Sequence, residues 1–346
     1  MEKQIAVNER IRGEWVLYNI INRYGDTKVR KITREDLARL ISNPPYKPIY
    51  KKIRGKLRLL FVPEKKLMIL LRGILEVILY DFDVSVFAHG GVLKRSVVTN
   101  AQPHLGSSAF FKIDFKNYYP SITRRMVVDN LRDLFEKSLS FGFFRNCGLV
   151  DFKIARALAN TIGGLVTFRN VLPQGAPTSS YLQNLIFRQL DQEIAELSRE
   201  HNVNYTRFVD DMVFSTIGAA IPIEFRKNLI DLIKKRIGYS LKFNRKKIYY
   251  KTGQGRLPVI TGITLSMGDN VPRLSLPRKQ IERYRSILHN ASLGMLSREK
   301  AWGIVGWVKM TLGKFPIRLK GPFLKFLGNC YPDSWDKKLD RYKDML

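Results

Sequence analysis

The strongest constraint on the fold lies in a stretch that reads Tyr205-Thr-Arg-Phe-Val-Asp-Asp-Met-Val-Phe214. Aromatic and β-branched residues flank Asp210 and Asp211, and each flank is typical of a short β-strand. The aspartates would then occupy the tight turn between the strands, where Asp is well tolerated. Two adjacent carboxylates repel each other, and their burial is costly unless a cation neutralises them. The pair is therefore either an ordinary acidic turn or a site for Mg²⁺, a hard cation that prefers oxygen ligands.

A further carboxylate ends an apolar strand pattern upstream. Residues 108–113 have the composition of a buried strand, Asp114 follows them, and Pro120 ends any strand soon afterwards. A carboxylate at the end of a buried strand, combined with the pair at 210–211, is the arrangement that two-metal phosphoryl transfer requires. The alternative is that Asp114 caps a helix or lies in a turn.

Two other segments could contact a substrate. Basic and apolar residues alternate between residues 51 and 62, which predicts a strand with a basic face. Lys56 and Arg58 on such a strand could hold a triphosphate, although a solvated strand face would explain either residue alone. The loop at 172–180 contains Gly and small residues, which let the backbone approach a ligand closely. It precedes a helix predicted from Tyr181 to about Glu200.

Helices are predicted at both ends of the chain. Thr33, with Asp36 three residues later, has the spacing of a helix N-cap and predicts a helix through Ile41. The C-terminal part has helical patterns at residues 277–291, 297–312 and about 316–330. Lys and Arg recur along these three helices, and a basic helical bundle suits binding to a nucleic-acid backbone.

The charge of the chain narrows the class of partner. Its 346 residues include 60 Lys and Arg against 30 Asp and Glu, a formal net charge of +30. Such an excess is self-repelling unless a polyanion is a regular partner, and nucleic acid is the first candidate. An anionic membrane surface is the second, but no uncharged apolar run is long enough to span a bilayer, so we expect no membrane partner.

Cysteine and histidine content excludes other kinds of site. Cys147 and Cys330 are the only cysteines in the sequence and lie far apart, which excludes a disulfide framework and a cysteine-based zinc site. The four histidines show no metal-ligand spacing. The N-terminus has no secretory pattern, so we expect a cytoplasmic protein.

The order of these elements resembles that of the reverse transcriptases over nearly the whole chain. Three blocks carry the resemblance: Lys112-Ile-Asp114 with Tyr118-Tyr-Pro-Ser-Ile122, Leu172-Pro-Gln-Gly-Ala-Pro-Thr-Ser179, and Phe208-Val-Asp-Asp211, with Asn244-Arg-Lys-Lys247 after them. The resemblance implies an α+β right-hand polymerase with an antiparallel palm sheet and a helical thumb. It also implies an N-terminal helical extension at 1–50, fingers at 51–108 with part of the palm connection, a palm at 109–268 with fingers helices in 123–170, and a thumb at 269–346.

Two blocks resemble those of bacterial retron reverse transcriptases in particular. Asn100-Ala-Gln-Pro-His104 is similar to their Asn-Ala-x-x-His block, and Ile260-Thr-Gly262 to their Val-Thr-Gly block. Phe208 stands where Tyr is usual and Val209 where Ala is common. Ser180 stands where Pro often follows the block that ends at Ser179. The first two changes stay apolar and leave both carboxylates in place.

The retron resemblance implies a function and a set of partners. Such an enzyme is an RNA-directed DNA polymerase that copies part of a structured non-coding RNA into a small DNA, primed from a 2′-hydroxyl of that RNA. Its partners would be this RNA and its cDNA, deoxynucleoside triphosphates and a retron effector protein, and it would act in anti-phage defence.

The resemblance also implies residue roles. Two Mg²⁺ ions would be held by Asp114, Asp210 and Asp211. The nucleotide would be bound by residues from several blocks: Lys56 and Arg58 at the triphosphate, Tyr119 under the sugar, Gln174 in the pocket and Lys247 at the departing pyrophosphate. The two retron blocks would recognise the RNA or organise the fold around it, through Asn100, His104, Thr261 and Gly262.

Two alternatives are weighed against this reading. A group II intron or diversity-generating reverse transcriptase would share the blocks. The sequence ends soon after the predicted thumb and leaves no room for a maturase or endonuclease domain, which disfavours the intron type. A non-catalytic RNA-binding scaffold with the same fold would be expected to lose carboxylates, and all three are present.

Overall fold

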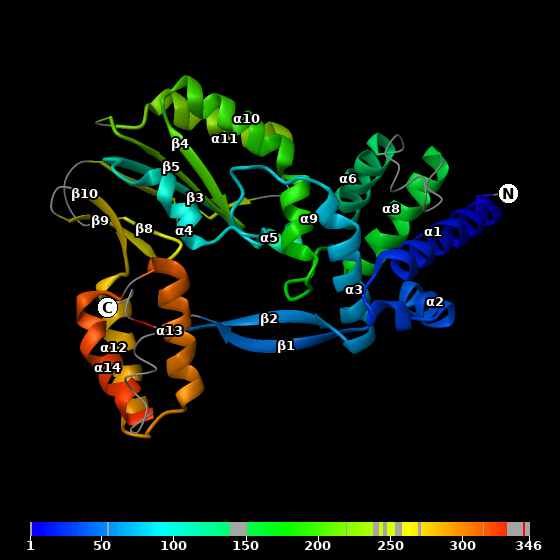
Figure 1. The fold of residues 1–346 in the computed structure, drawn as a ribbon. Helices are drawn as coiled ribbons and strands as arrows, with labels where there is room; N and C mark the ends of the chain where they lie inside the picture. The colour runs from blue at the N-terminus through cyan, green and yellow to red at the C-terminus, as the bar shows by residue number, and fades with distance from the viewer. Residues whose placement is uncertain are drawn as a thin grey trace. The chain divides into compact units, whose positions relative to one another are not determined.

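A computed structural model of the chain describes residues 2–53, 55–138, 151–218, 220–237, 242–244, 248–252, 258–268, 271–313, 315–330 and 342. The chain divides into two compact units, whose elements are drawn in Figure 1. The first comprises Met1–Val92, Asp114–Leu197 and Lys227–Lys246, and the second comprises Leu93–Ile113, Ser198–Arg226 and Lys247–Leu346. The chain passes back and forth between the two units. This division does not test the boundaries predicted for the fingers, palm and thumb, which therefore remain a prediction.

Helices form most of the first unit. They are α1 (Glu2–Tyr24), α2 (Arg34–Ser42), α3 (Lys65–Val77), α5 (Tyr118–Ser121), α6 (Arg124–Lys137), α8 (Phe152–Val166) and α9 (Ser179–Ile186), with α10 (Arg188–Glu200) and α11 (Ile223–Ile237) crossing its limits. The predicted cap of α2 is confirmed, because the Thr33 hydroxyl accepts from the Asp36 N–H. The single helix predicted from Tyr181 to about Glu200 is wrong in one respect, since Phe187 separates α9 from α10.

Helix α1 packs against α8 within the first unit. Its inner face buries apolar residues completely, among them Val16, Leu17 and Ile20. Gly13 lies at a close contact between the two helices, because a Cβ atom added there would be 2.4 Å from the Ala157 carbonyl oxygen. Elsewhere in the unit, the Lys66 ammonium of α3 donates to both carboxylate oxygens of Asp36 at 2.9 Å and holds the pKa of that carboxyl below its usual value.

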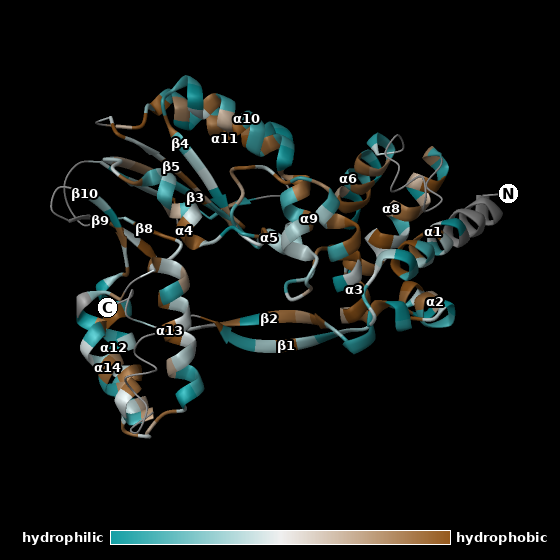
Figure 2. Cartoon of the chain, viewed as in Figure 1, coloured by the Kyte–Doolittle hydropathy of each residue, from teal (hydrophilic) through white to brown (hydrophobic). Residues whose placement is uncertain are grey.

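A two-stranded ribbon extends from the helices of the first unit. Strand β1 (Tyr46–Ile53) pairs antiparallel with β2 (Lys56–Pro63), from Tyr46 opposite Pro63 to Ile53 opposite Lys56. Both strands mix hydrophilic and hydrophobic residues along their length (Figure 2), and most of β1 is exposed. The base of the ribbon is anchored, because the Tyr46 hydroxyl donates to the Leu165 carbonyl at 2.8 Å. Burial there raises the pKa of Tyr46.

Antiparallel strands form the central sheet, in the order β4-β5-β3-β6 with β7 also paired to β3. Its members are β3 (Ala109–Lys116), β4 (Asn204–Phe208), β5 (Asp211–Thr216), β6 (Lys242–Phe243) and β7 (Tyr249–Lys251). Strand β3 is buried along almost all of its length, and it pairs antiparallel with β6 and with β7. Together with the helices, this sheet confirms the predicted α+β class with an antiparallel sheet.

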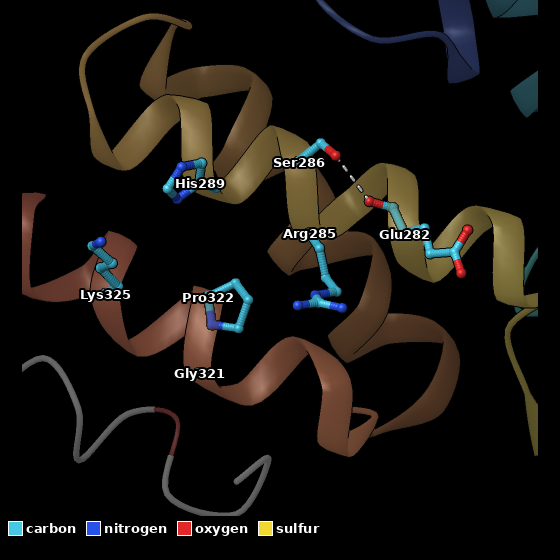
Figure 3. A pocket seen from close by; sticks show the side chains of 7 residues that line it. All are labelled: Glu282, Arg285, Ser286, His289, Gly321, Pro322 and Lys325. Atoms are coloured by element: carbon cyan, nitrogen blue, oxygen red, sulfur yellow. Dashed lines mark hydrogen bonds between the residues drawn. The ribbon is translucent and has the colours of Figure 1, made fainter.

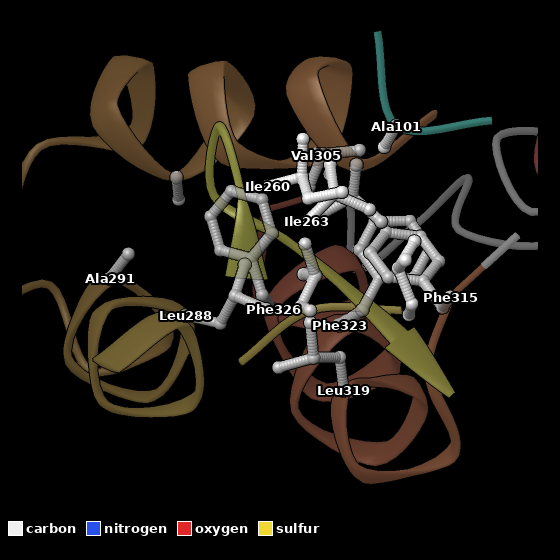
Figure 4. Close-up of a cluster of buried hydrophobic side chains, with 14 of the residues drawn as sticks. Ala101, Ile260, Ile263, Leu288, Ala291, Val305, Phe315, Leu319, Phe323 and Phe326 are labelled. Atoms are coloured by element: carbon white, nitrogen blue, oxygen red, sulfur yellow. The ribbon is translucent and has the colours of Figure 1, made fainter. Parts of the chain in front are cut away.

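The second unit contains the C-terminal helices and a smaller sheet. Helices α12 (Arg278–Ser292), α13 (Arg298–Leu312) and α14 (Ile317–Cys330) begin and end within a residue or so of the predicted limits. Strands β8 (Val259–Ile260), β9 (Ile263–Gly268) and β10 (Val271–Ser275) pair in the order β10-β9-β8. One hydrophobic core joins them to the short helix α4 (Val97–Ala101), and Figure 4 shows Ala101 beside residues of the helices and of β8 and β9. No helix in the described ranges is long and apolar enough to cross a membrane.

The contact at Gly13 generates a stability prediction. Gly-to-Ala inside a helix normally stabilises it by about 1 kcal/mol, but the added methyl group at position 13 would overlap α8. We therefore expect Gly13→Ala to destabilise the protein by about 1–3 kcal/mol, measured by thermal or urea denaturation. Gly303→Ala in α13 is the matched control, because a Cβ atom there meets nothing within 4 Å. Equal stability of the two variants would contradict the close contact.

Candidate active site

The turn between β4 and β5 carries the adjacent aspartates. Phe208 pairs with Asp211, so Val209 and Asp210 form a two-residue turn and Asp211 begins β5. The φ angle of Val209 is 61°, a left-handed conformation that β-branched residues avoid. Arg207 stabilises it, since its fully buried guanidinium donates from Nη1 to the Val209 carbonyl at 3.1 Å. The structure therefore confirms the predicted hairpin and differs in one respect, since only Asp210 lies in the turn and Asp211 is already part of β5.

Asp211 faces a cation of the same unit. The Lys112 ammonium on β3 lies 3.3 Å from Oδ2 of Asp211, and both side chains are largely but not fully buried. Lys112 also donates to the Val259 carbonyl at 3.3 Å, which fixes its position. Its positive charge offsets part of the repulsion between the two neighbouring carboxylates.

Asp114 lies on β3 and is the first residue of the segment Asp114–Leu197, which belongs to the first unit. Its side chain is buried, and Asn244 Nδ2 donates to Asp114 Oδ1 at 3.1 Å. The Asn244 backbone N–H also donates to the Asp114 backbone carbonyl at 2.8 Å, so Asn244 holds both the backbone and the carboxylate of Asp114. Lys247, from the same predicted block, lies outside the described residues.

The donor chemistry of the three aspartates fits a hard cation. Their carboxylate oxygens are ligands that Mg²⁺ prefers. Asp211 already has the Lys112 ammonium beside it, which indicates that this position accommodates positive charge. Within the described ranges, no group of three or more His, Cys, Asp or Glu side chains is gathered closely enough to hold a metal ion.

The predicted nucleotide-binding residues that the structure describes belong to the first unit. The Tyr119 hydroxyl lies 2.9 Å from Ser180 Oγ, a contact that fixes the ring between α5 and α9. The Gln174 carbonyl accepts from the Phe61 N–H of β2 at 2.9 Å, so the loop at 172–180 docks on the ribbon. Arg58 is exposed on β2, whereas the side chain of Lys56 lies outside the described residues.

This docked loop needs glycine. Gly175 has a φ angle of 129°, and a Cβ atom there would be 2.9 Å from the Phe61 carbonyl oxygen. The backbone of the loop therefore lies against β2 more closely than a side chain would allow. The glycine that suggested close approach to a ligand thus has a packing role within the protein itself.

The residues of the two retron-like blocks lie together in the second unit. Asn100 Nδ2 donates to Thr261 Oγ1 at 3.3 Å, and Gly262 completes the turn between β8 and β9. The side chains of Asn100 and His104 are fully buried. This arrangement favours the second of the two roles considered for these blocks, organisation of the fold, while contact with RNA stays a prediction.

The C-terminal helices form an open cavity of about 560 Å³. It lies between α12 and α14, as Figure 3 shows, and its lining is Glu282, Arg285, Ser286, His289, Gly321, Pro322 and Lys325. Arg285 and Lys325 bring positive charge to it, and their side chains are exposed. The lining is therefore suited to an anionic group, as the basic character of these helices predicted.

Sequence reasoning missed several residues that support the site. Arg207, Thr206 and Ser215 were not assigned roles, although all three side chains are buried on the hairpin that carries the aspartates. For Arg207 the sequence did hold a signal, because a charged residue in the middle of an apolar strand pattern must find a partner when it is buried. Lys112 and Asn244 were quoted only as parts of blocks, because their partners are distant in sequence.

Comparison with known families agrees with this arrangement. Residues 47–268 match the family model described as reverse transcriptase (RNA-dependent DNA polymerase), which is more than half of the chain. A telomerase from Candida albicans, among solved structures, aligns with 86% of this chain and 57% of its own at a TM-score of 0.45 and 11% identity, a likeness too distant to bear on function.

Curated relatives are retron enzymes. The chain is 27% identical to the retron Mx162 reverse transcriptase of Myxococcus xanthus, over 74% of this chain and 56% of the relative. It is 26% identical to the retron Ec86 reverse transcriptase of Escherichia coli, over 84% of each. It is 30% identical to the retron Mx65 reverse transcriptase of Myxococcus xanthus, over 75% of this chain and 59% of the relative. The chain thus spans little more than half the length of the two Myxococcus relatives. It belongs to the reverse transcriptase family, among the bacterial retron enzymes.

Proposed function

We propose that this chain is an RNA-directed DNA polymerase that copies part of a structured retron RNA into a small DNA, primed from a 2′-hydroxyl of that RNA. The observation that carries the proposal is the acidic hairpin. Asp210 lies in a strained two-residue turn that a buried arginine holds, and Asp211 follows it directly, within the span that matches the reverse transcriptase model. Strain of this kind persists where the surrounding structure enforces it, and it is concentrated at functional sites.

The aspartates would hold two Mg²⁺ ions. When bound, these ions supply activation of the primer hydroxyl and neutralisation of charge on the departing pyrophosphate. Asn244 would orient Asp114 for this task, since it donates to one of its carboxylate oxygens. Lys112 would share Asp211 with the metal, which leaves Asp210 as the principal ligand of the pair.

The nucleotide would be bound by residues of the first unit. Arg58 is suited to the triphosphate, because a guanidinium binds phosphate oxygens in pairs, and Lys56 and Lys247 would add positive charge. Tyr119 would exclude a 2′-hydroxyl from the incoming sugar, with its ring held in place by Ser180. Gln174 would line the pocket through the loop that docks on β2.

The RNA and its cDNA would be bound by basic surfaces. The net charge of +30 supports a polyanionic partner, and the cavity lined by Arg285, His289 and Lys325 would accept backbone phosphates. We further propose a cytoplasmic location and a retron effector protein as partner in anti-phage defence. Protection that persists after the polymerase is inactivated would contradict the defence role of the cDNA.

Removal of the acidic pair should abolish synthesis. We expect Asp210→Asn with Asp211→Asn to lower cDNA synthesis by about 10³-fold or more, because charge stabilisation is lost at the reacting phosphate. RNA binding, measured by filter retention, should change little. The control is Asp133→Asn with Asp231→Asn, which removes the same charge from exposed positions. Substantial activity in the first double variant would disprove the assignment.

The sugar-discrimination role of Tyr119 is tested separately. Tyr119→Ala should lower the preference for deoxynucleotides over ribonucleotides by about ten-fold or more, since the steric barrier to the 2′-hydroxyl is removed. Tyr119→Phe keeps the ring and loses the contact with Ser180, so it should retain most of the preference. The measurement is kcat/KM for paired deoxy and ribo substrates. An unchanged ratio in the alanine variant would exclude this residue as the gate.

The retron assignment predicts a specific product. Nucleic acid that copurifies with the active protein should contain DNA joined to RNA through a 2′–5′ bond, detected by sequencing and by sensitivity to a debranching enzyme. Protein with both Asp210 and Asp211 replaced by Asn should retain the RNA without attached DNA. DNA joined only through ordinary 3′–5′ bonds would favour another kind of reverse transcriptase.

A further inference from the structure

We propose that the buried side chains of the segment Asn100–His104 form a clamp that positions the hairpin bearing Asp210 and Asp211. The inference rests on the polymerase activity proposed above and assigns a role to the two retron-like blocks. The clamp comprises side chains from four parts of the second unit that are joined by hydrogen bonds: Asn100, His104, Thr206, Ser215 and Thr261.

His104 joins both strands of the hairpin. Its Nδ1 lies 2.7 Å from Ser215 Oγ on β5, and its Nε2 lies 2.8 Å from Thr206 Oγ1 on β4. Thr206 lies four residues before Asp210, and Ser215 lies four residues after Asp211. A single imidazole, with none of its surface exposed, therefore fixes the spacing of the two strands close to the acidic turn.

The hydrogen-bond directions select one form of the imidazole. The Thr206 hydroxyl donates to the Asn100 carbonyl at 3.1 Å, so its single proton is used and it must accept from His104 Nε2. Nδ1 then accepts from the Ser215 hydroxyl, which in turn accepts from Ser107 at 2.9 Å. A neutral ring with its proton on Nε2 satisfies every one of these groups.

Asn100 connects the clamp to the turn between β8 and β9. Its amide donates to Thr261 Oγ1 at 3.3 Å, and the Thr261 hydroxyl donates to the Val97 carbonyl at 3.4 Å. Thr261 and Gly262 have φ angles of 49° and 90°, the signs of a type I′ turn. Gly or Asn would suit the first of these positions better than a β-branched residue. The Thr261 hydroxyl accepts one hydrogen bond from α4 and donates another to it, which explains why threonine occupies this position.

The clamp acts from inside the protein. Ala101 and Ile260 belong to the hydrophobic core of α12–α14 (Figure 4). The same core contains Val213 of β5. Asn100 and His104 are closed to solvent, so they are positioning residues that act through the hairpin backbone. The repulsion between Asp210 and Asp211 and the strain at Val209 would otherwise favour relaxation of the turn.

Substitution of Thr206 tests the clamp without a change in side-chain shape. Thr206→Val removes the hydroxyl, and we expect kcat to fall about ten-fold with the nucleotide KM changed less than about two-fold, because small misplacement lowers reaction more than binding. Binding of Mn²⁺ to the protein without nucleotide, followed by the electron paramagnetic resonance of free Mn²⁺, should weaken about five-fold. Thr206→Ser keeps the hydroxyl and should restore both quantities to within about two-fold.

Thr261 provides a second, independent variant. Thr261→Gly removes backbone strain as well as the hydroxyl. If Thr261 served only the turn, this variant would keep the wild-type kcat and gain thermal stability. The clamp predicts lowered kcat and weakened Mn²⁺ binding even if the melting temperature rises. Thr311→Val in α13 is the control, because its buried hydroxyl has no hydrogen-bond partner among the described residues.

The outcomes separate the clamp from the proposed activity. Wild-type kcat and Mn²⁺ binding in folded Thr206→Val or in Thr261→Gly would overturn the clamp, as would equal losses in Thr206→Val and Thr206→Ser. Circular dichroism reports folding, and if Thr206→Val does not fold, Thr261→Gly decides. If the wild-type protein polymerises no nucleotide, the proposed function fails, whereas the Mn²⁺ titration still shows whether the clamp positions the aspartates.

Discussion

Adjacent carboxylates at the tip of the β4–β5 hairpin repel each other, and the backbone at Val209 has a φ angle of 61° that a β-branched residue avoids. A conformation of this kind costs about 1–3 kcal/mol and requires surroundings that enforce it. The chain provides them through buried groups on the hairpin. The Tyr205 and Phe214 rings stack across the strands with centroids 5.0 Å apart, and Arg207 holds the Val209 carbonyl. The acidic turn therefore depends on the interior of the protein beneath it.

Both faces of the hairpin are supported, because side chains alternate along a strand. On one face, Phe214 contacts the rings of Phe111 and Phe225 at centroid distances of 6.0 and 5.6 Å. On the other, Val213 enters the core of the C-terminal helices and Ser215 meets His104. The aromatic face is held by packing, and the opposite face is held by packing and by directed hydrogen bonds. Hydrogen bonds fix strand spacing and orientation more narrowly than apolar contacts, which suits a hairpin whose tip must carry chemistry.

Local periodicity was sufficient to predict the hairpin, the cap at Thr33 and the three C-terminal helices, because each depends on residues a few positions apart. It did not reveal the break at Phe187, where a continuous apolar pattern conceals a change of helix. Nor could it pair Lys112 with Asp211, since the partners lie on different strands. Asn100 and Thr261 are 161 residues apart, so only the folded sheet and core bring the two retron-like blocks together. The blocks were recognised as patterns, but their burial was not predictable from the pattern alone.

The polar clamp is costly to bury, and this cost indicates that the clamp serves a purpose other than stability. The Asn100 side-chain oxygen is buried without a hydrogen-bond partner in the described part of the chain. An orphaned acceptor of this kind costs about 1–3 kcal/mol, and apolar residues of similar volume would avoid that cost. Thr261 adds strain to the same network. Two unfavourable features in one hydrogen-bonded cluster are poorly explained by stability. They are better explained by geometry, because His104, three residues after the end of α4, makes directed hydrogen bonds to both hairpin strands at once.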